Sequence, residues 1–131
     1  MAVRNLVKCS KEYWNFVRNL RNQNIGFVNQ GNITSEQQTQ YMTKYSDNYK
    51  VCLVNEFPAG FIGIIDNDIR FAVAEEFRNQ GLAKWMLHKF PIPKNTIGKV
   101  KKDNLYSCKL FLSLNWQEII DENKEFFIFK K

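Results

Sequence analysis

The spacing of the apolar residues changes once along this chain, near Tyr49. Before Tyr49, apolar side chains recur every three to four residues, which predicts amphipathic helices. From Tyr49 onward, turn residues separate short runs rich in β-branched and aromatic residues, namely YKVCLVNE, AGFIGIID and DIRFAV. Such runs predict three strands in an antiparallel meander. Helices followed by a meander restrict the chain to mixed α/β layer folds.

Two helices are predicted before the meander. Ser10 can cap the first helix, in which the apolar residues between positions 13 and 20 follow the helical period. The segment that follows, NQNIGFVNQGN, is rich in glycine and asparagine and is predicted to be a loop. Thr34 and Gln37 form a capping-box pattern that opens a second helix through Tyr45.

Helices and strands alternate beyond the meander. Apolar residues from Leu82 to Phe90 follow the helical period until Pro91 ends the helix. We then expect a strand at 96–101, a helix at about 103–114, and strands at 115–120 and 125–130. The order ααβββαβαββ leaves room for one more strand at the N-terminus. A right-handed crossover makes the strands at 68–73 and 96–101 parallel. With no linker in 131 residues, one domain spanning 1–131 is expected.

The net charge of +6 and the pI near 9.3 would suit nucleic acid, an anionic membrane face or a polyanionic small molecule. The basic residues are spread along the chain. Their densest run, at 94–102, is expected to be a solvated loop and strand face. No zinc finger or RNP1 motif organises them, so no nucleic-acid partner is expected. No run approaches the roughly 20 apolar residues of a membrane span, and no signal peptide is recognisable. We therefore expect no membrane partner.

The cysteines Cys9, Cys52 and Cys108 are odd in number and far apart, and they lack metal-ligand spacing. Buried free thiols in a cytoplasmic protein without a bound metal are the expected interpretation. His88 is the only histidine. It has no accompanying nucleophile motif, so we expect it on a helix surface rather than in a catalytic triad.

Gly81 lies between a predicted strand and a predicted helix, in the stretch FRNQGLAKWML. Backbone N–H groups at a helix N-terminus are free to bind phosphate oxygens, which the helix dipole also favours. A glycine lets the backbone approach such an anion closely, and Ala83 keeps the first turn slim. Alternatively, Gly81 only adopts an unusual dihedral angle and Ala83 only packs against the sheet.

The stretch RNQGLA, at 78–83, resembles the Q/R-x-x-G-x-G/A motif of the Gcn5-related N-acetyltransferases (GNAT). The preceding VAEEF is similar to the family's V-x-P-E-Y, with Glu75 in place of proline. VKKDNLYSCKLFLSLNW is similar to the second signature, a strand-end Asn followed by a helix N-x-x-S-x-x-x-Y/F that ends in Gly-Phe. Asn115 and Trp116 replace that Gly-Phe. The motifs cover 71–116, while the element order matches over nearly the whole chain. The resemblance implies a mixed, centrally splayed β-sheet flanked by helices.

The resemblance also implies that acetyl-coenzyme A binds as a co-substrate in the gap between the splayed strands. Backbone groups of Phe71, Ala72 and Val73 would meet the pantetheine arm and the acetyl carbonyl, where a donor stabilises the developing oxyanion. The pyrophosphate would lie against the motif, which comprises Arg78, Asn79, Gln80, Gly81, Leu82, Ala83 and Lys84. Residues of the second signature would complete the cofactor site; these are Asn104, Ser107 and Phe111.

The general acid and the general base stay open. Many members of the family carry at the position of Phe111 a tyrosine that protonates the departing thiolate, and phenylalanine cannot do so. Either Tyr106 or Ser107 serves instead, or the thiolate takes its proton from water. Some members use a carboxylate at the start of the strand before the motif as the base. We expect Asp68 in that role, ahead of Asp66 and Glu56, although turn formation also explains these acidic residues.

The N-terminal helices would form a wall of the acceptor site. FVRNLRN and ITSEQQTQYM are similar to patterns in members that acetylate amino sugars on nucleotide carriers, which implies an anionic or polyhydroxyl acceptor. On that basis the acceptor-binding candidates are Arg18, Arg21, Asn22, Gln38 and Tyr41. The expected partner is a small-molecule amine, and the protein would be a monomer or a homodimer. Three alternatives remain open: acetylation of a protein N-terminus, a lysine or a small polyamine, although a basic surface would repel polyamines; a catalytically degenerate module that binds coenzyme A; and a basic nucleic-acid-binding domain.

Overall fold

The computed structural model describes residues 2–23, 32–119 and 126–131. Its elements, including three short 3-10 helices, follow in the order β1 (Arg4–Lys8), η1 (Lys11–Tyr13), α1 (Trp14–Gln23), α2 (Ser35–Tyr45), η2 (Ser46–Asn48), β2 (Tyr49–Val54), β3 (Phe57–Ile65), β4 (Asp68–Val73), η3 (Glu75–Phe77), α3 (Leu82–Lys89), β5 (Ile97–Lys101), α4 (Leu105–Ser113), β6 (Gln117–Ile119) and β7 (Phe126–Lys130).

The described strands form one seven-stranded sheet in the order β1-β2-β3-β4-β5-β7-β6. Neighbouring strands are antiparallel except β4 and β5, which are parallel and share a single register pair, Asp68 with Ile97. The predicted meander, the crossover through α3 and the splayed centre of the sheet are therefore confirmed. The fold is mixed α/β, as expected.

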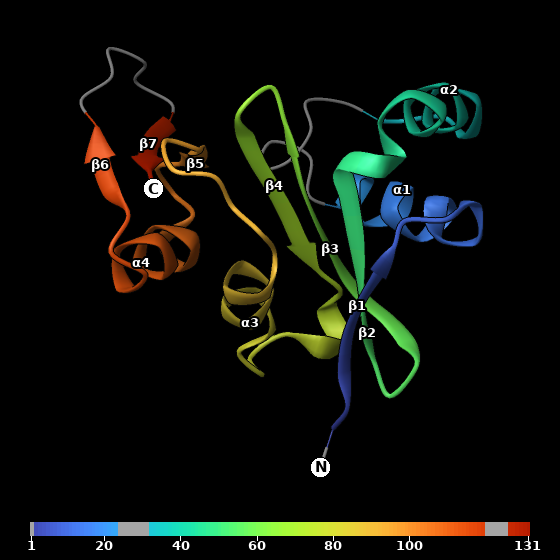
Figure 1. Ribbon diagram of the computed structural model, residues 1–131, viewed down its shortest axis with the longest axis horizontal. Coiled ribbons are helices and arrows are strands. Elements are labelled where there is room, and N and C mark those ends of the chain that lie inside the picture. Colours follow the sequence, from blue (N-terminus) through green and yellow to red (C-terminus); the bar gives the residue numbers. More distant parts are fainter. Residues whose placement is uncertain (1, 24–31, 120–125) are drawn as a thin grey trace.

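Helices cover both faces of the sheet. In Figure 1, α1 and α2 lie on one side of strands β1 to β4, and α3 lies on the other. The alternation of side chains along β3 explains why two cores form: Phe61 packs in the cluster under α1 and α2, while Ile62 packs in the cluster with Met86 and Phe111 under α3 and α4. The sheet is thus buried on both faces at its centre, and the two helical layers meet the gap between β4 and β5 from opposite sides.

The capping box of α2 has the predicted form. The Thr34 hydroxyl accepts from the Gln37 N–H at 3.1 Å, and the Gln37 side chain accepts from the Thr34 N–H at 2.9 Å. The prediction for Ser10 was wrong. Its hydroxyl donates to the Glu12 carboxylate at 3.1 Å rather than capping a helix. A 3-10 turn follows Ser10, so that α1 begins only at Trp14.

Several boundaries also differ from the sequence-based expectation. The additional N-terminal strand exists as β1, which pairs with β2. The strand predicted at 115–120 begins at Gln117, because Asn115 has a positive φ of 64° and the Trp116 N–H donates to the Phe111 carbonyl at 3.0 Å. Most of the predicted loop NQNIGFVNQGN lies outside the described residues, as do Ile120 and Glu125.

The three cysteines are buried free thiols, as predicted. Burial raises the pKa of both the Cys9 and the Cys52 thiol to about 11. His88 is exposed on α3, and the side chains of the basic run at 94–102 that carry charge are exposed or half-buried. In the described part of the chain, no helix has the length and apolar character needed to cross a membrane.

Candidate functional site

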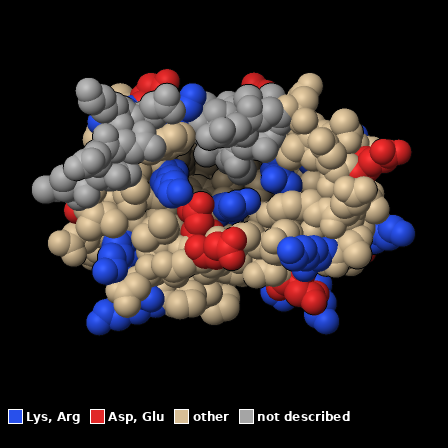
Figure 2. Space-filling view, turned by 90° about the horizontal axis from the view of Figure 1, so that it is seen from above, with Lys and Arg blue, Asp and Glu red and all other residues tan. Residues whose placement is uncertain are grey.

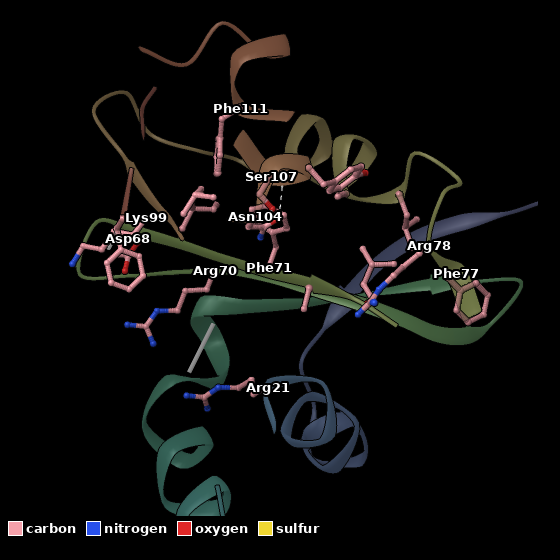
Figure 3. Close-up of a pocket in the computed structure, with 18 of the residues that line it drawn as sticks. Arg21, Asp68, Arg70, Phe71, Phe77, Arg78, Lys99, Asn104, Ser107 and Phe111 are labelled. Atoms are coloured by element: carbon pink, nitrogen blue, oxygen red, sulfur yellow. Dashed lines mark hydrogen bonds between the residues drawn. The ribbon is translucent and has the colours of Figure 1, made fainter. Parts of the chain in front are cut away.

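A cleft of about 660 Å³ opens between β4 and β5. It exists because the two strands pair only at Asp68 and Ile97 and then diverge, so the facing edge of β4 beyond Asp68 is not covered by β5. Figure 2 shows the surface hollowed at its middle, with basic and acidic side chains around the opening. Figure 3 shows Asp68 and Lys99 at one end of the cleft and Phe77 and Arg78 at the other.

The open edge of β4 presents backbone groups to the cleft. The Ala74 N–H donates to the Ala59 carbonyl on β3 at 2.7 Å. Backbone groups alternate in direction along an antiparallel pair, so those of Ala72 also face β3. The backbone groups of Phe71 and Val73 consequently face the cleft. The Val73 carbonyl accepts from the Arg78 Nε at 3.2 Å, which holds the Arg78 side chain at this end of the site.

The loop before α3 brings a helix N-terminus to the same end of the cleft. Gly81 is the N-cap, with a left-handed φ of 71°, and Asn79 also has a positive φ of 64°. No described atom lies within 4 Å of the place where a side chain on Gly81 would begin. The first intrahelical bond joins the Trp85 N–H to the Gly81 carbonyl at 3.0 Å, so the N–H groups of residues 82–84 have no intrahelical partner.

The predicted phosphate-binding residues do not all face the cleft. Arg78, Asn79, Leu82 and Ala83 line it, while the described lining does not include Gln80, Gly81 or Lys84. The Gln80 carbonyl accepts from Nη2 of Arg4 at 2.6 Å, which ties the loop to β1. Leu82 and Ala83 are buried against the sheet. The small side chain of Ala83 therefore lets α3 pack against the sheet, and it also keeps the first turn of the helix narrow.

The N-terminus of α4 forms the opposite wall. The Asn104 side chain caps α4 by accepting from the Ser107 N–H at 3.2 Å, and its Nδ2 donates to the Ser107 hydroxyl at 3.1 Å (Figure 3). Asn104, Tyr106 and Ser107 all line the cleft. Since the Ser107 oxygen accepts from Asn104, its own proton remains available to a ligand. Tyr106 is 58% exposed.

Phe111 lies in an aromatic cluster at the floor of the cleft. Its ring stacks on Phe129 at 5.3 Å and meets Phe71 edge-on at 5.9 Å. A side-chain carbon at Gly98 would lie 2.6 Å from the Cζ atom of Phe111, so β5 needs glycine at this point. The resemblance associates this position with a tyrosine hydroxyl, but here the ring is 1% exposed and Cζ is already in contact with β5.

The three candidate carboxylates have different environments. Asp68 is half-buried in the cleft, and burial raises the pKa of its carboxyl, partly offset by the charges of Arg70 and Lys99. Asp66 and Glu56 are exposed in two-residue hairpin turns, where they have positive φ angles of 49° and 72°. Positive φ at both central positions is typical of type I′ turns. Turn formation therefore accounts for Asp66 and Glu56, and only Asp68 lines the described cleft.

The five predicted acceptor residues separate into two groups. Arg18 and Asn22 join α1 to Ile33, just before α2: the Asn22 amide exchanges bonds of 2.7 and 3.1 Å with the backbone of Ile33, and Nη1 of Arg18 donates to the Ile33 carbonyl at 3.4 Å. Arg21, Gln38 and Tyr41 form the second group at the sheet. Nη1 of Arg21 donates to Gln38 at 3.2 Å, and the guanidinium lies 4.4 Å from the centroid of the Tyr41 ring. Of the five, Arg21 is the one that lines the described cleft.

Sequence reasoning missed Arg70, Lys99, Phe77 and Phe126, which also line the cleft. Arg70 carried a usable signal, because it is a charged residue within the apolar strand that precedes the glycine motif. It lies on the same side of β4 as the buried Ala72, two residues further along, and so faces α1 and α2. Nη1 of Arg70 donates to the Tyr41 hydroxyl at 3.3 Å.

No family model and no curated protein matches this sequence. Solved structures match along nearly its whole length. An N-acetyltransferase from Staphylococcus aureus Mu50 has a TM-score of 0.77 and 14% identity, over 100% of this chain and 98% of that one. An acetyltransferase of the GNAT family from Streptococcus pneumoniae has a TM-score of 0.66 and 16% identity, over 98% and 96%.

Spermidine N-acetyltransferase from Vibrio cholerae, solved with CoA and spermine, has a TM-score of 0.74 and 11% identity, over 98% of this chain and 92% of that one. Structural matches at such low sequence identity show a shared fold; they do not show a shared acceptor. The splayed parallel pair, the glycine-led helix after β4 and these structural matches together show that this chain has the fold of the GNAT acetyltransferases.

Proposed function

We propose that this protein is an N-acetyltransferase that moves the acetyl group of acetyl-coenzyme A to a primary amine by direct attack. Two features that lie together at one end of the cleft carry the proposal. One is the free backbone edge of β4, and the other is a helix N-terminus capped by a glycine with a left-handed φ. The first can bind an extended pantetheine arm and the second a pyrophosphate. The V. cholerae enzyme of the same fold was solved with CoA, which supports this assignment.

The residues fit such a ligand on chemical grounds. The N–H groups of residues 82–84 lack intrahelical partners, and the space beside Gly81 is open in the described structure. Arg78 adds a positive charge beside them. Asn104 and Ser107 offer polar groups across the cleft, while Phe71 and Phe111 provide apolar surface between. Together they would hold anionic phosphates at one end and place the thioester near the middle of β4.

The transfer follows from this placement. The amine nitrogen forms a bond to the thioester carbonyl carbon, and the bond from that carbon to sulfur then breaks. A backbone N–H on β4 directed at the carbonyl oxygen would stabilise the charge that develops on it. The ammonium loses one proton before the attack, for which Asp68 is our candidate acceptor, and the nitrogen loses a second proton to solvent as the amide forms. The departing thiolate takes a proton from Tyr106, from Ser107 or from water, and holding the two reactants together supplies much of the remaining acceleration.

For the acceptor we propose a small-molecule amine, with amino sugars as the first class to test. An acceptor screen in which peptides react while amino sugars stay inert would reject that class in favour of peptide acetylation. The position of Phe111 in the core favours a second candidate, a module that binds coenzyme A without catalysis. Turnover of any amine would exclude it. We further propose that residues 1–131 form one domain acting in the cytoplasm, where buried thiols stay reduced.

The test is a titration of the purified protein with acetyl-coenzyme A, in parallel with a pantetheine thioester that lacks the phosphates. Wild type is compared with Gly81→Glu and Gly81→Asn. Asparagine tolerates a left-handed φ, so Gly81→Asn should fold normally. Glutamate adds bulk and negative charge where the phosphates would bind, so Gly81→Glu should lose affinity for acetyl-coenzyme A but not for the phosphate-free thioester. If wild type binds neither compound, the proposed function is wrong.

A further inference from the structure

The residues at the end of the cleft away from the proposed phosphate site indicate the chemical class of the acceptor. We propose that the acceptor amine carries an anionic group, a carboxylate or a phosphate ester, which Arg21 of α1 and Arg70 of β4 bind together. This inference rests on the proposed acetyl transfer for the presence of an acceptor, and it concerns contacts that acetyl-coenzyme A itself does not need.

Arg21 is a buried cation with unused hydrogen-bonding capacity. Its side chain is 7% exposed, although it lines the cleft. Nη1 donates to Oε1 of Gln38, but Nε has no hydrogen-bond partner among the described residues. A buried guanidinium is usually paired with an anion or fully hydrogen-bonded, because taking the charge out of water is costly. An anion arriving in the cleft would provide the missing partner.

The guanidinium of Arg21 is held in place by its neighbours. Gln38 is 2% exposed, and its Nε2 donates to the Trp14 carbonyl at 2.9 Å. That bond directs Oε1 of Gln38 at Arg21. The Tyr41 ring lies against the guanidinium at 4.4 Å from its centroid. A planar cation fixed by an amide and an aromatic face is preorganised for a fork-shaped contact with a carboxylate or phosphate.

Arg70 reaches the same tyrosine from the sheet. Its Nη1 donates to the Tyr41 hydroxyl at 3.3 Å, while Arg21 lies over the ring of that residue. Figure 3 shows both arginines on the α1 and α2 side of β4, with their guanidinium groups pointing the same way. Both cations therefore contact Tyr41, and an anion that met both guanidinium groups would relieve the repulsion between them.

The charge of the cleft favours an anionic acceptor over a polycationic one. The cationic side chains in its described lining are those of Arg21, Arg70, Arg78 and Lys99, while Asp68 supplies a single carboxylate. Arg78 lies at the phosphate end. The remaining three cations outnumber Asp68 at the acceptor end, so a linear polyamine would meet net repulsion there. An amine with its own anionic group would have partners for both of its charges.

The test uses pairs of amines that differ in the anionic group: diaminobutyrate with diaminopropane for the carboxylate, and glucosamine phosphate with glucosamine for the phosphate. Calorimetric titration into the protein saturated with coenzyme A measures acceptor binding without turnover. The variants are Arg70→Gln, Arg21→Gln and Arg21→Lys. The control is Lys44→Gln, which removes one positive charge from the exposed end of α2, outside the cleft lining.

We expect wild type to bind the member of one pair that carries the anionic group more tightly than the member that lacks it, and the pair that responds identifies the group. Loss of a charge-assisted contact should weaken that binding about 10- to 100-fold in Arg70→Gln and Arg21→Gln. Arg21→Lys keeps the charge without the fork and should lie between. Lys44→Gln should resemble wild type. Should Arg21→Gln not fold, Arg70→Gln and Arg21→Lys still carry the test.

Two results would overturn the inference: wild type binds neither amine with an anionic group better than its partner without that group, or Arg70→Gln matches Lys44→Gln. A parallel assay of acetyl transfer separates this failure from failure of the proposed function. Acetyl transfer to amines that lack the anionic group, without any preference for those that carry it, would reject only the anionic acceptor. If an anionic amine binds in an arginine-dependent way but no acetyl group is transferred, only the proposed acetyltransferase activity is rejected.

Discussion

The hydroxyl oxygens of Tyr41 and Tyr49 lie 2.6 Å apart. Tyr41 belongs to α2 and Tyr49 opens β2, so this hydrogen bond joins a helix of the proposed acceptor wall to the sheet. Tyr49 is 1% exposed. Burial, together with the neighbouring Tyr41, raises the pKa of Tyr49 well above its ordinary value, although the charges of Arg70 and Arg21 oppose the shift. Tyr49 is therefore protonated at neutral pH and able to take part in a neutral hydrogen-bonded pair.

Replacing Tyr49 by Phe should destabilise the protein by about 0.5–1.5 kcal/mol, the net value of one buried hydrogen bond. The ring itself remains, so its edge contact with Phe61 is kept. Chemical denaturation monitored by circular dichroism measures the free energy of unfolding.

Tyr45→Phe is the matched control, because the Tyr45 hydroxyl makes no hydrogen bond to a described residue while its ring also contacts Tyr41. It should change the free energy of unfolding by less than Tyr49→Phe does. Equal losses in both variants would mean that the bond between Tyr41 and Tyr49 contributes nothing to stability.

Phe111→Tyr tests whether this chain can accept the tyrosine that the GNAT resemblance associates with the position. The new hydroxyl would extend from Cζ into β5 at Gly98, where the contact is already tight. We expect a loss of about 1–3 kcal/mol in stability from overpacking. We also expect no gain in acetyl transfer, because the hydroxyl would be displaced from the cleft. Thermal unfolding and turnover measured on the same preparation test both statements.

Phe111→Leu is the companion variant. It removes volume instead of adding it and should also destabilise, through the cavity it leaves. A Phe111→Tyr protein as stable as wild type and faster in turnover would show that the cleft has room for a phenolic acid at this position.

Much of the end of the cleft that holds the proposed phosphate site was predictable, because its features are local in sequence. A glycine one residue before an apolar helix permits an unusual backbone dihedral, and Gly81 has a left-handed φ of 71°. The capping box of Thr34 and Gln37 is likewise a relation over three residues. Ser10 shows the limit of such rules. Its hydroxyl had a nearby carboxylate in Glu12, and that contact replaced the helix cap.

The proposed acceptor end of the cleft depends on contacts between distant residues, which periodicity does not encode. Arg18 and Arg21 are one turn apart on α1 and looked equivalent in the sequence. In the structure, packing of α1 against α2 and β4 buries Arg21, while Arg18 stays half-buried beside Asn15. Tyr49 and Arg70 meet Tyr41 only because β2 and β4 lie on either side of β3. Such relations require the register of the sheet.

Tyr106→Phe tests the exposed phenol as general acid. If Tyr106 protonates the departing thiolate, the variant should lower the turnover number and remove the decline of activity at alkaline pH, where a phenolic acid would lose its proton. Ser107→Ala should then leave the pH profile in place. Turnover measured across pH with one amine and saturating acetyl-coenzyme A decides between the two. An unchanged profile in Tyr106→Phe removes that residue as the acid.

The raised pKa of Asp68 links stability and activity through one carboxyl. Its cause is burial, which the charges of Arg70 and Lys99 only partly offset. The Asp68 carboxylate therefore binds its proton more tightly in the folded protein than in the unfolded chain. The stability that this provides is fully present below the pKa of the unfolded chain, and it is lost as pH rises through the folded pKa. Above the folded pKa the ionised carboxylate is a cost to the fold.

Asp68→Asn should accordingly raise the melting temperature at neutral pH, because asparagine has a similar shape without the charge. The gain should shrink as pH falls and the wild-type carboxyl becomes protonated. If Asp68 is the general base, the same variant should lose both turnover and the rise of activity with pH. Asp66→Asn is the control: its exposed turn position suits asparagine equally, so melting and pH profile should match wild type. Full activity in Asp68→Asn would reject Asp68 as the general base. A melting temperature lower than that of wild type would mean that the attraction of the carboxylate to Arg70 and Lys99 outweighs the cost of burying its charge.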